Sequence, residues 1–188
     1  MTKIVVVYHS GYGHTAAQAR AVAKGAERVA ETEVILLDSD EAQQNWDSLN
    51  TADAIIFGSP TYMGSVSAQF KAFMDASSGI WFNRGWKDKV AAGFTTSASQ
   101  SGDKLNTIIQ LTIFAAQHGM IWVGNDLLPG NNSSAGSVND LNRLGGFLGA
   151  LAQANSDQGP DVAPLQSDLL TAEHLGERVA SITTKIHG

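Results

Sequence analysis

The chain has 188 residues, a formal net charge of −6 at pH 7, 43% hydrophobic residues and no cysteine. This length and apolar content predict one compact domain over residues 1–188 and exclude a disordered chain. The lack of cysteine excludes a disulfide scaffold and thiol catalysis, and the negative charge argues against nucleic-acid binding. No apolar run approaches the roughly 20 residues of a membrane span, and none forms a signal peptide, so we expect a cytoplasmic protein.

Short apolar runs alternate with longer amphipathic stretches along the chain. The continuous β-branched run at residues 3–8 predicts a strand buried on both faces. Alanines and valines at helical spacing predict a helix over residues 14–30. The same reasoning predicts strands at residues 32–38, 53–58, 89–96 and 120–124, and helices at 66–76, 105–117 and 169–186.

Five strand–helix units without a strong hairpin signal predict an α/β fold with a parallel sheet and helices on both faces. Right-handed crossovers favour the flavodoxin-like strand order 2-1-3-4-5, which makes a three-layer α/β/α sandwich. Residues 125–164 lie outside this pattern and are rich in Asn, Ser and Gly. We expect a short helix at 138–151 there, and a segment of this length is usually functional or partly mobile.

Three loops should carry the chemistry, because open α/β sheets bind ligands outside the carboxyl ends of their strands. The first loop, residues 9–15, places two hydroxyls and two glycines directly before a helix, which favours a phosphate cradle. The absence of Gly-Lys-Ser/Thr excludes a P-loop NTPase. Residues 11–16 also fit Gly-x-Gly-x-x-Gly/Ala, with Asp38 near the ribose-binding position. A dinucleotide-binding domain and an ordinary capped turn therefore stay open as alternatives.

The loops after the third and fourth strands are polar as well. Residues 58–64 contain Pro60 between two glycines, and residues 95–102 are rich in hydroxyls. Solvated turns often have this composition. Two such loops beside a phosphate cradle nevertheless suit a flat heteroaromatic ring with several hydrogen-bonding edges.

As a set, the motifs at residues 10–15, 60–64, 79–81 and 118–120 resemble the WrbA-type flavodoxin-like NAD(P)H:quinone oxidoreductases, which bind FMN. The resemblance runs in register from residue 3 to about residue 124, and again in the last helix. It implies that the first loop holds the FMN phosphate and that the other two loops line the isoalloxazine ring. The implied cofactor-binding residues are Ser10, Gly11, Tyr12, Gly13, His14, Thr15, Pro60, Thr61, Tyr62, Met63, Gly64, Thr96, Ser97, Ala98, Ser99, Gln100 and Ser101.

The resemblance also implies that Tyr12 and Trp81 contact substrates and that His118 is catalytic. The predicted topology puts Trp81 and His118 at the amino-terminal edge of the sheet, opposite the flavin. They would act only from a neighbouring subunit, and the resemblance implies a homodimer or homotetramer. Taken alone, His118 is typical of a helix C-terminus and Trp81 of a core or interface aromatic.

Some positions depart from the family pattern. Tyr62 stands where an arginine is common, Met63 stands where a phenylalanine is common, and residues 97–101 contain fewer glycines than the family's third loop. These changes affect the nicotinamide contact and the ring contacts more than FMN binding itself.

The resemblance implies an FMN-dependent oxidoreductase that passes a hydride from NADH or NADPH to a quinone-type acceptor. We expect a ping-pong order, with N–H groups of the third loop stabilising negative charge on reduced flavin. The sequence offers no compact His/carboxylate cluster for a metal. A flavodoxin-type electron carrier and an FMN-binding regulatory or storage protein without substantial turnover are the alternatives. A carrier is usually more acidic around its flavin than this chain's charge suggests.

Overall fold

The structure is a computed structural model that describes residues 1–187. Its central sheet has the order β2-β1-β3-β5-β6, which confirms the predicted topology. The inner strands are buried almost throughout, as continuous apolar runs between two helical layers require. The parallel strands are β1 (Thr2–Tyr8), β2 (Thr32–Asp38), β3 (Ala54–Tyr62), β5 (Val90–Ser97) and β6 (Ile121–Trp122).

The last strand position of the sheet is filled in two parts. β6 pairs with the start of β5, and β7 (Ala150–Gln153) pairs in parallel with its end. The chain leaves the sheet between these two strands, and Gly149 allows the return, because a Cβ there would collide with the carbonyl oxygen of Gly93. The helix predicted at residues 138–151 is therefore wrong. Turns occupy most of that stretch, and Gly145 takes a positive φ of 68° that a helix does not contain.

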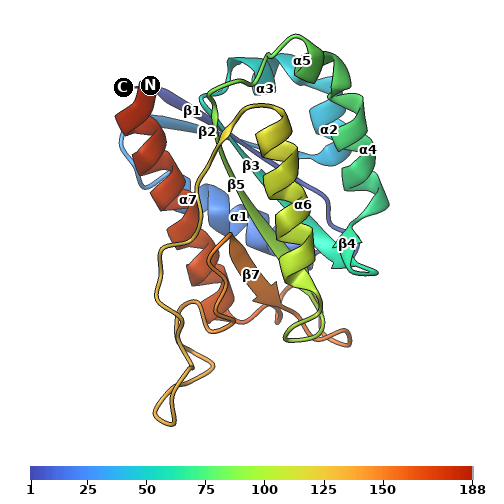
Figure 1. Ribbon diagram of the computed structural model, residues 1–188. Coiled ribbons are helices and arrows are strands. Elements are labelled where there is room, and N and C mark those ends of the chain that lie inside the picture. The colour runs from blue at the N-terminus through green and yellow to red at the C-terminus, as the bar shows by residue number, and fades with distance from the viewer. Residues whose placement is uncertain (188) are drawn as a thin grey trace.

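Helices cover both faces of the sheet (Figure 1). One face carries α1 and α7, whose backbones approach so closely that a Cβ at Gly25 or Gly176 would collide with the partner helix. The other face has an aromatic core that includes Phe57, Phe73 and Trp86. Within residues 1–187, no helix has the length and hydrophobicity to cross a membrane. The helices are α1 (His14–Ala26), α2 (Ser39–Gln44), α3 (Trp46–Thr51), α4 (Ala68–Ala76), α5 (Ser78–Phe82), α6 (Lys104–Gln117) and α7 (Gln166–His187).

A small hairpin departs from the predicted all-parallel sheet. β3 runs four residues beyond its predicted end, and β4 (Ser65–Val66) pairs antiparallel with it. The two linking residues, Met63 and Gly64, have φ values of 49° and 76°, as a type I′ turn requires. Methionine is uncommon in this conformation, so the local sequence carried little hairpin signal.

Candidate functional site

A cleft of about 570 Å³ opens at the carboxyl ends of β1, β3 and β5. This volume lies within the range of small-molecule and cofactor sites. All three predicted loops contribute to its lining. The predicted residues that line it are Ser10, Tyr12, His14, Thr15, Pro60, Thr61, Tyr62, Thr96, Ser97 and Ala98.

The first loop leaves the start of α1 free for a ligand. Gly13 is the N-cap of α1 with a φ of 89°, and no side chain caps that end of the helix. The Ser10 hydroxyl instead accepts a hydrogen bond from the Gly13 N–H at 3.0 Å, which holds the loop in a tight turn. The uncapped N–H groups and the helix dipole together favour an anion such as a phosphate. Gly13 also lies under Pro160, because a Cβ at this position would come within 2.8 Å of the proline ring.

Among residues 1–187, no lysine or arginine lines the cleft. The uncapped start of α1 contributes positive potential there through the helix dipole. The His14 Nε2–H donates to the carbonyl oxygen of Gln158 at 2.7 Å, so this side chain ties the first loop to the loop after β7.

Buried hydroxyls form the floor of the cleft. The Thr61 hydroxyl lies 2.9 Å from the hydroxyls of both Thr95 and Thr107. The Thr96 hydroxyl donates to Gln18 Oε1 at 2.6 Å, and the Gln18 amide donates to the Ala150 carbonyl at 3.1 Å. These bonds fix the strand ends before any ligand arrives, which is the preorganisation that a binding site needs.

Sequence reasoning missed Gln18, which is fully buried in the helix α1. A signal for it existed, because Gln18 stands four residues before Val22 and eight before Ala26 on the apolar stripe of the helix. A polar residue on such a stripe must find a buried partner, and Gln18 finds two.

Two tyrosines stand at the mouth of the cleft. Tyr12 is 77% exposed, and its ring centroid lies 6.4 Å from that of Tyr62 in an edge-to-face arrangement. Burial raises the pKa of Tyr62, the neighbouring Tyr12 raises it further, and a backbone hydrogen bond with Gly11 lowers it. Tyr62 therefore stays neutral at physiological pH and offers a hydroxyl and an aromatic face.

The loop after β7 forms a wall that sequence reasoning did not assign. Four of its residues line the cleft. The sequence predicted only that residues 125–164 as a whole have a functional role or are partly mobile. The Asn, Ser and Gly content behind that prediction does not indicate which residues reach the site. They are Ala154, Ser156, Gln158 and Gly159.

Other predicted site residues do not line the cleft. Gly11 and Gly13 shape the first loop, and Met63 is fully exposed at the tip of the hairpin beside Gly64. In the third loop, the lining of the cleft ends at Ala98, and the next residues continue along its edge. Its predicted residues outside the lining are Ser99, Gln100 and Ser101.

Trp81 and His118 lie together, but in a different groove. A groove of about 420 Å³ runs between α4, α5 and α6 and includes both side chains in its lining. Figure 1 shows α5 and the last turn of α6 at the end of the sheet opposite to β4 and the β7 arrowhead. The structure therefore does not bring either residue to the cleft of its own chain.

His118 is enclosed within this second region. Its side chain is 2% exposed, and its ring centroid lies 4.4 Å from that of Trp86. Ser77 donates its hydroxyl proton to the Met74 carbonyl at 2.7 Å, so the 3.0 Å contact between Ser77 Oγ and His118 is donated by Nε2–H. Burial, assisted by Arg84, lowers the pKa of His118 to about 4. The imidazole is therefore neutral at physiological pH. Among residues 1–187, no group of three or more His, Asp or Glu could hold a metal ion.

Comparison with known proteins agrees with this geometry. Residues 2–133 match the model of the NADPH-dependent FMN reductase family. The chain is 47% identical to flavodoxin FldP of Pseudomonas aeruginosa and 32% identical to an NAD(P)H dehydrogenase (quinone) of Azorhizobium caulinodans, and each alignment covers 100% of both chains. A solved structure of a flavodoxin, WrbA-like protein from Agrobacterium tumefaciens superposes with a TM-score of 0.75 at 41% identity, covering 98% of this chain and 99% of the other.

Proposed function

The chain belongs to the NADPH-dependent FMN reductase family and is of the WrbA type, and from that premise we propose that it is an FMN-dependent oxidoreductase passing a hydride from NAD(P)H to a quinone-type acceptor. One observation carries the proposal: an uncapped helix start and a polar slot share one cleft at the carboxyl end of the sheet. An anionic group and a flat ring of one ligand fit side by side there.

The cleft residues divide the work of holding FMN. The N–H groups at the start of α1, with the hydroxyls of Ser10 and Thr15, would hold the phosphate. The strand ends carrying Thr61 and Thr96, whose hydroxyls are hydrogen-bonded within the protein, would give the ring a rigid wall. When bound, FMN supplies the redox chemistry, because its ring takes up a hydride and releases it to an acceptor.

Tyr12 provides an exposed aromatic surface at the mouth, where a nicotinamide ring can stack. Tyr12 and Tyr62 line the same cleft, so donor and acceptor would both approach the flavin past these two rings. We therefore propose a ping-pong order. The His14 contact with Gln158 joins the loop after β7 to the first loop, so this loop would flank the bound phosphate.

The decisive experiment is anaerobic. The FMN-loaded protein is mixed with NADH or NADPH in a stopped-flow instrument, and the flavin absorbance near its yellow maximum is followed. Rapid bleaching that reverses when benzoquinone is added supports the proposal. Bound flavin that stays oxidised with both donors overturns it.

A second candidate function is that of a flavodoxin-type electron carrier. The observation that favours it is the 47% identity to a protein named flavodoxin FldP over the whole chain. The same mixing experiment separates the two functions. A carrier would stay oxidised with NADH and NADPH alone and would become reduced only when a flavoprotein reductase is added.

We also propose that the working form is a homodimer or homotetramer in which Trp81 of a neighbouring copy stands near the acceptor. Trp81 is 44% exposed, so it is accessible to another copy. His118 is enclosed by its own chain, so the proposal includes no catalytic step for it.

A further inference from the structure

Lys104, the first residue of α6, has an unusual environment for a lysine. It is 1% exposed, and its ammonium faces the inner side of the third loop. Its Nζ donates to three successive carbonyl oxygens, those of Ser99 at 2.6 Å, Gln100 at 2.9 Å and Ser101 at 3.5 Å. A buried ammonium is costly unless all its donors are satisfied, so the loop and the lysine stabilise each other.

The preceding carbonyl is held in the same way. The side-chain amide of Gln153, at the end of β7, donates to the Ala98 carbonyl at 2.8 Å. Four consecutive carbonyls, from Ala98 to Ser101, thus accept side-chain donors. In a planar trans peptide the N–H points away from the C=O, so the four N–H groups from Ser99 to Gly102 point away from these donors.

These N–H groups are free to meet a ligand. Within residues 1–187, none of the four donates a hydrogen bond to another protein group. Successive outward N–H groups form a concave site for negative charge, and a cation behind them strengthens its potential. The loop carrying them continues directly from Thr96, Ser97 and Ala98, which line the cleft.

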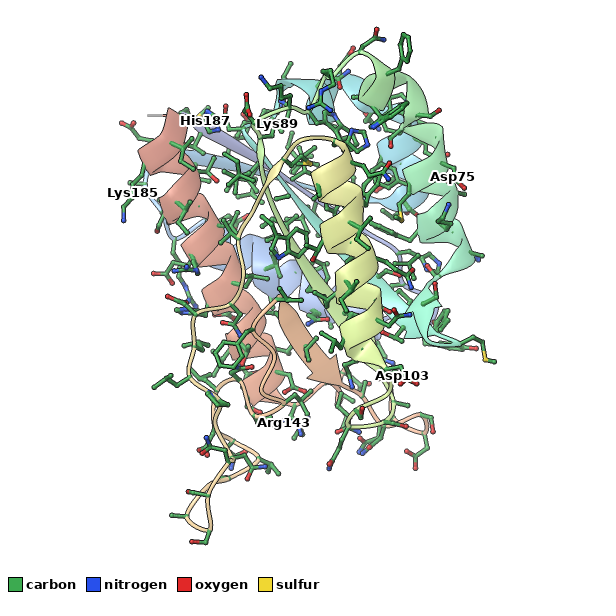
Figure 2. The ribbon with its side chains drawn as sticks, in the orientation of Figure 1. Asp75, Lys89, Asp103, Arg143, Lys185 and His187 are labelled. Atoms are coloured by element: carbon green, nitrogen blue, oxygen red, sulfur yellow. The ribbon has the colours of Figure 1, made fainter. Side chains whose placement is uncertain are left out.

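The charges around Lys104 come from two further elements. Asp168, in the first turn of α7, forms a bidentate pair with Arg143 at 2.8 and 2.7 Å, and both side chains are buried. Arg143 already pairs with Asp168, so among residues 1–187 no carboxylate forms an ion pair with the Lys104 ammonium. Burial lowers the pKa of Lys104 to about 8, while Asp168 raises it and Arg143 lowers it further. The neighbouring Asp103 is exposed. Figure 2 shows Asp103 and Arg143 at the same end of the molecule, with Lys89 at the other.

We propose that Lys104 is a positioning residue of the flavin site: its ammonium turns the carbonyls of the third loop inward and so presents the loop's N–H groups to the electron-rich edge of the FMN ring. The inference rests on the proposed function and deepens it. Since the ammonium can lose its proton under mildly alkaline conditions, the hold on the loop weakens there.

The test measures the dissociation constant of FMN by quenching of flavin fluorescence between pH 6.5 and 9.5. Lys104→Met keeps the length of the side chain and removes its donors, whereas Lys104→Arg keeps a permanent charge. Lys185→Met removes an exposed cation at the far end of α7 and is the matched control. We expect Lys104→Met to bind FMN about tenfold more weakly at pH 7.

The pH profile separates positioning from simple packing. Wild-type affinity should weaken several-fold as the pH rises through about 8, the pKa of Lys104. Lys104→Arg should restore binding at pH 7 and keep it at pH 9, and Lys104→Met should show no such step. Lys185→Met should follow the wild type. A Lys104→Met protein with wild-type affinity and a wild-type profile overturns the inference.

Two further outcomes keep the test informative if Lys104→Met does not fold or if the protein does not bind FMN. NMR titration of the Lys104 side chain in the FMN-free wild type locates its protonation step. If Lys104→Met does not fold, a flat wild-type affinity through that step still overturns the inference. A wild-type protein that binds no FMN contradicts the proposed function, whereas unaltered binding by both Lys104 variants contradicts only the role of Lys104.

Discussion

The two ends of the central sheet use polar residues in opposite ways. At the carboxyl end, the start of α1 and the third loop leave N–H groups without partners among residues 1–187, and an open cleft lies beside them. At the amino end, His118 and Ser77 bond to each other beneath Trp86 and Phe114, so the polar groups are enclosed by aromatic rings.

This contrast shows that the type of a residue is a weaker guide to function than the partners it retains. A histidine beside a serine resembles catalytic machinery. Ser77, however, donates its hydroxyl hydrogen bond to a backbone carbonyl, and His118 is neutral and buried. Within the described part of the chain, neither lysine nor arginine lines the cleft at the carboxyl end, yet its free backbone donors favour an anion. His118 Nδ1 also lacks a hydrogen-bond partner among residues 1–187, but it is buried, so the donors that can meet a ligand are those exposed at the cleft.

The largest expected effect comes from filling the first loop. Gly13→Val places a β-branched side chain at a φ of 89° and against Pro160. We expect FMN affinity to fall about 100-fold or more, measured by fluorescence quenching. Gly79→Ala is the control at the amino end, since a Cβ there meets no atom within 4 Å. If Gly13→Val bound FMN with wild-type affinity, the first loop could not be the phosphate-binding site.

The next largest effect is expected at the amino end of the sheet, where the stability of the fold should depend on pH. The pKa of His118 is about 4 in the folded protein, below the roughly 6.5 of an unfolded histidine. The unfolded state therefore binds the extra proton first, and stability is lost as the pH falls from about 6.5 towards 4. We expect His118→Phe, which keeps the ring packing, to remove on the order of 2 kcal/mol of this loss. Urea unfolding at pH 7 and pH 4.5 measures it.

The control for that variant is its flavin site. His118→Phe should bind FMN with wild-type affinity at pH 7, because the ring lies in the groove at the opposite end of the sheet. An unchanged acid sensitivity of the variant would show that His118 is not the group responsible.

A smaller effect is expected at the mouth of the cleft. Tyr12→Ala removes an exposed ring, so the free energy of unfolding should change by less than about 0.5 kcal/mol. The KM for the nicotinamide donor should rise about tenfold when the protein is saturated with FMN. Steady-state kinetics with varied donor measure it. Leu128→Ala, which removes an 83% exposed side chain outside the cleft, is the matched control and should leave the KM unchanged.

The smallest effect tests whether the amino end of one subunit lies against the cleft of a neighbouring subunit. Trp81→Ala should leave FMN affinity unchanged and lower kcat/KM for benzoquinone about threefold, because the ring would act only from a neighbouring copy. Light scattering of the same samples gives the oligomeric state. A monomeric wild type with full activity contradicts the shared site.

Much of the fold was readable from the sequence, because buried parallel strands must be continuous apolar runs and their helices must carry one apolar face. The strand over Thr32–Asp38 has its predicted bounds, and the strand order follows from right-handed crossovers. The divided last strand was missed, because the four residues Ala150–Gln153 are too few for a periodic signal and a long excursion precedes them.

For the candidate site, too, the sequence predicted the local segments but not the long-range contacts. The amino-acid sequence was enough to predict the three loops at the carboxyl ends of the strands, because chain order and strand polarity place them together. Three contacts became apparent only in the folded chain: Gln158 with His14, Gln18 with Thr96, and Lys104 with the third loop. These pairs are far apart in sequence or depend on side-chain burial, and neither composition nor local spacing records which partner a buried polar group will find.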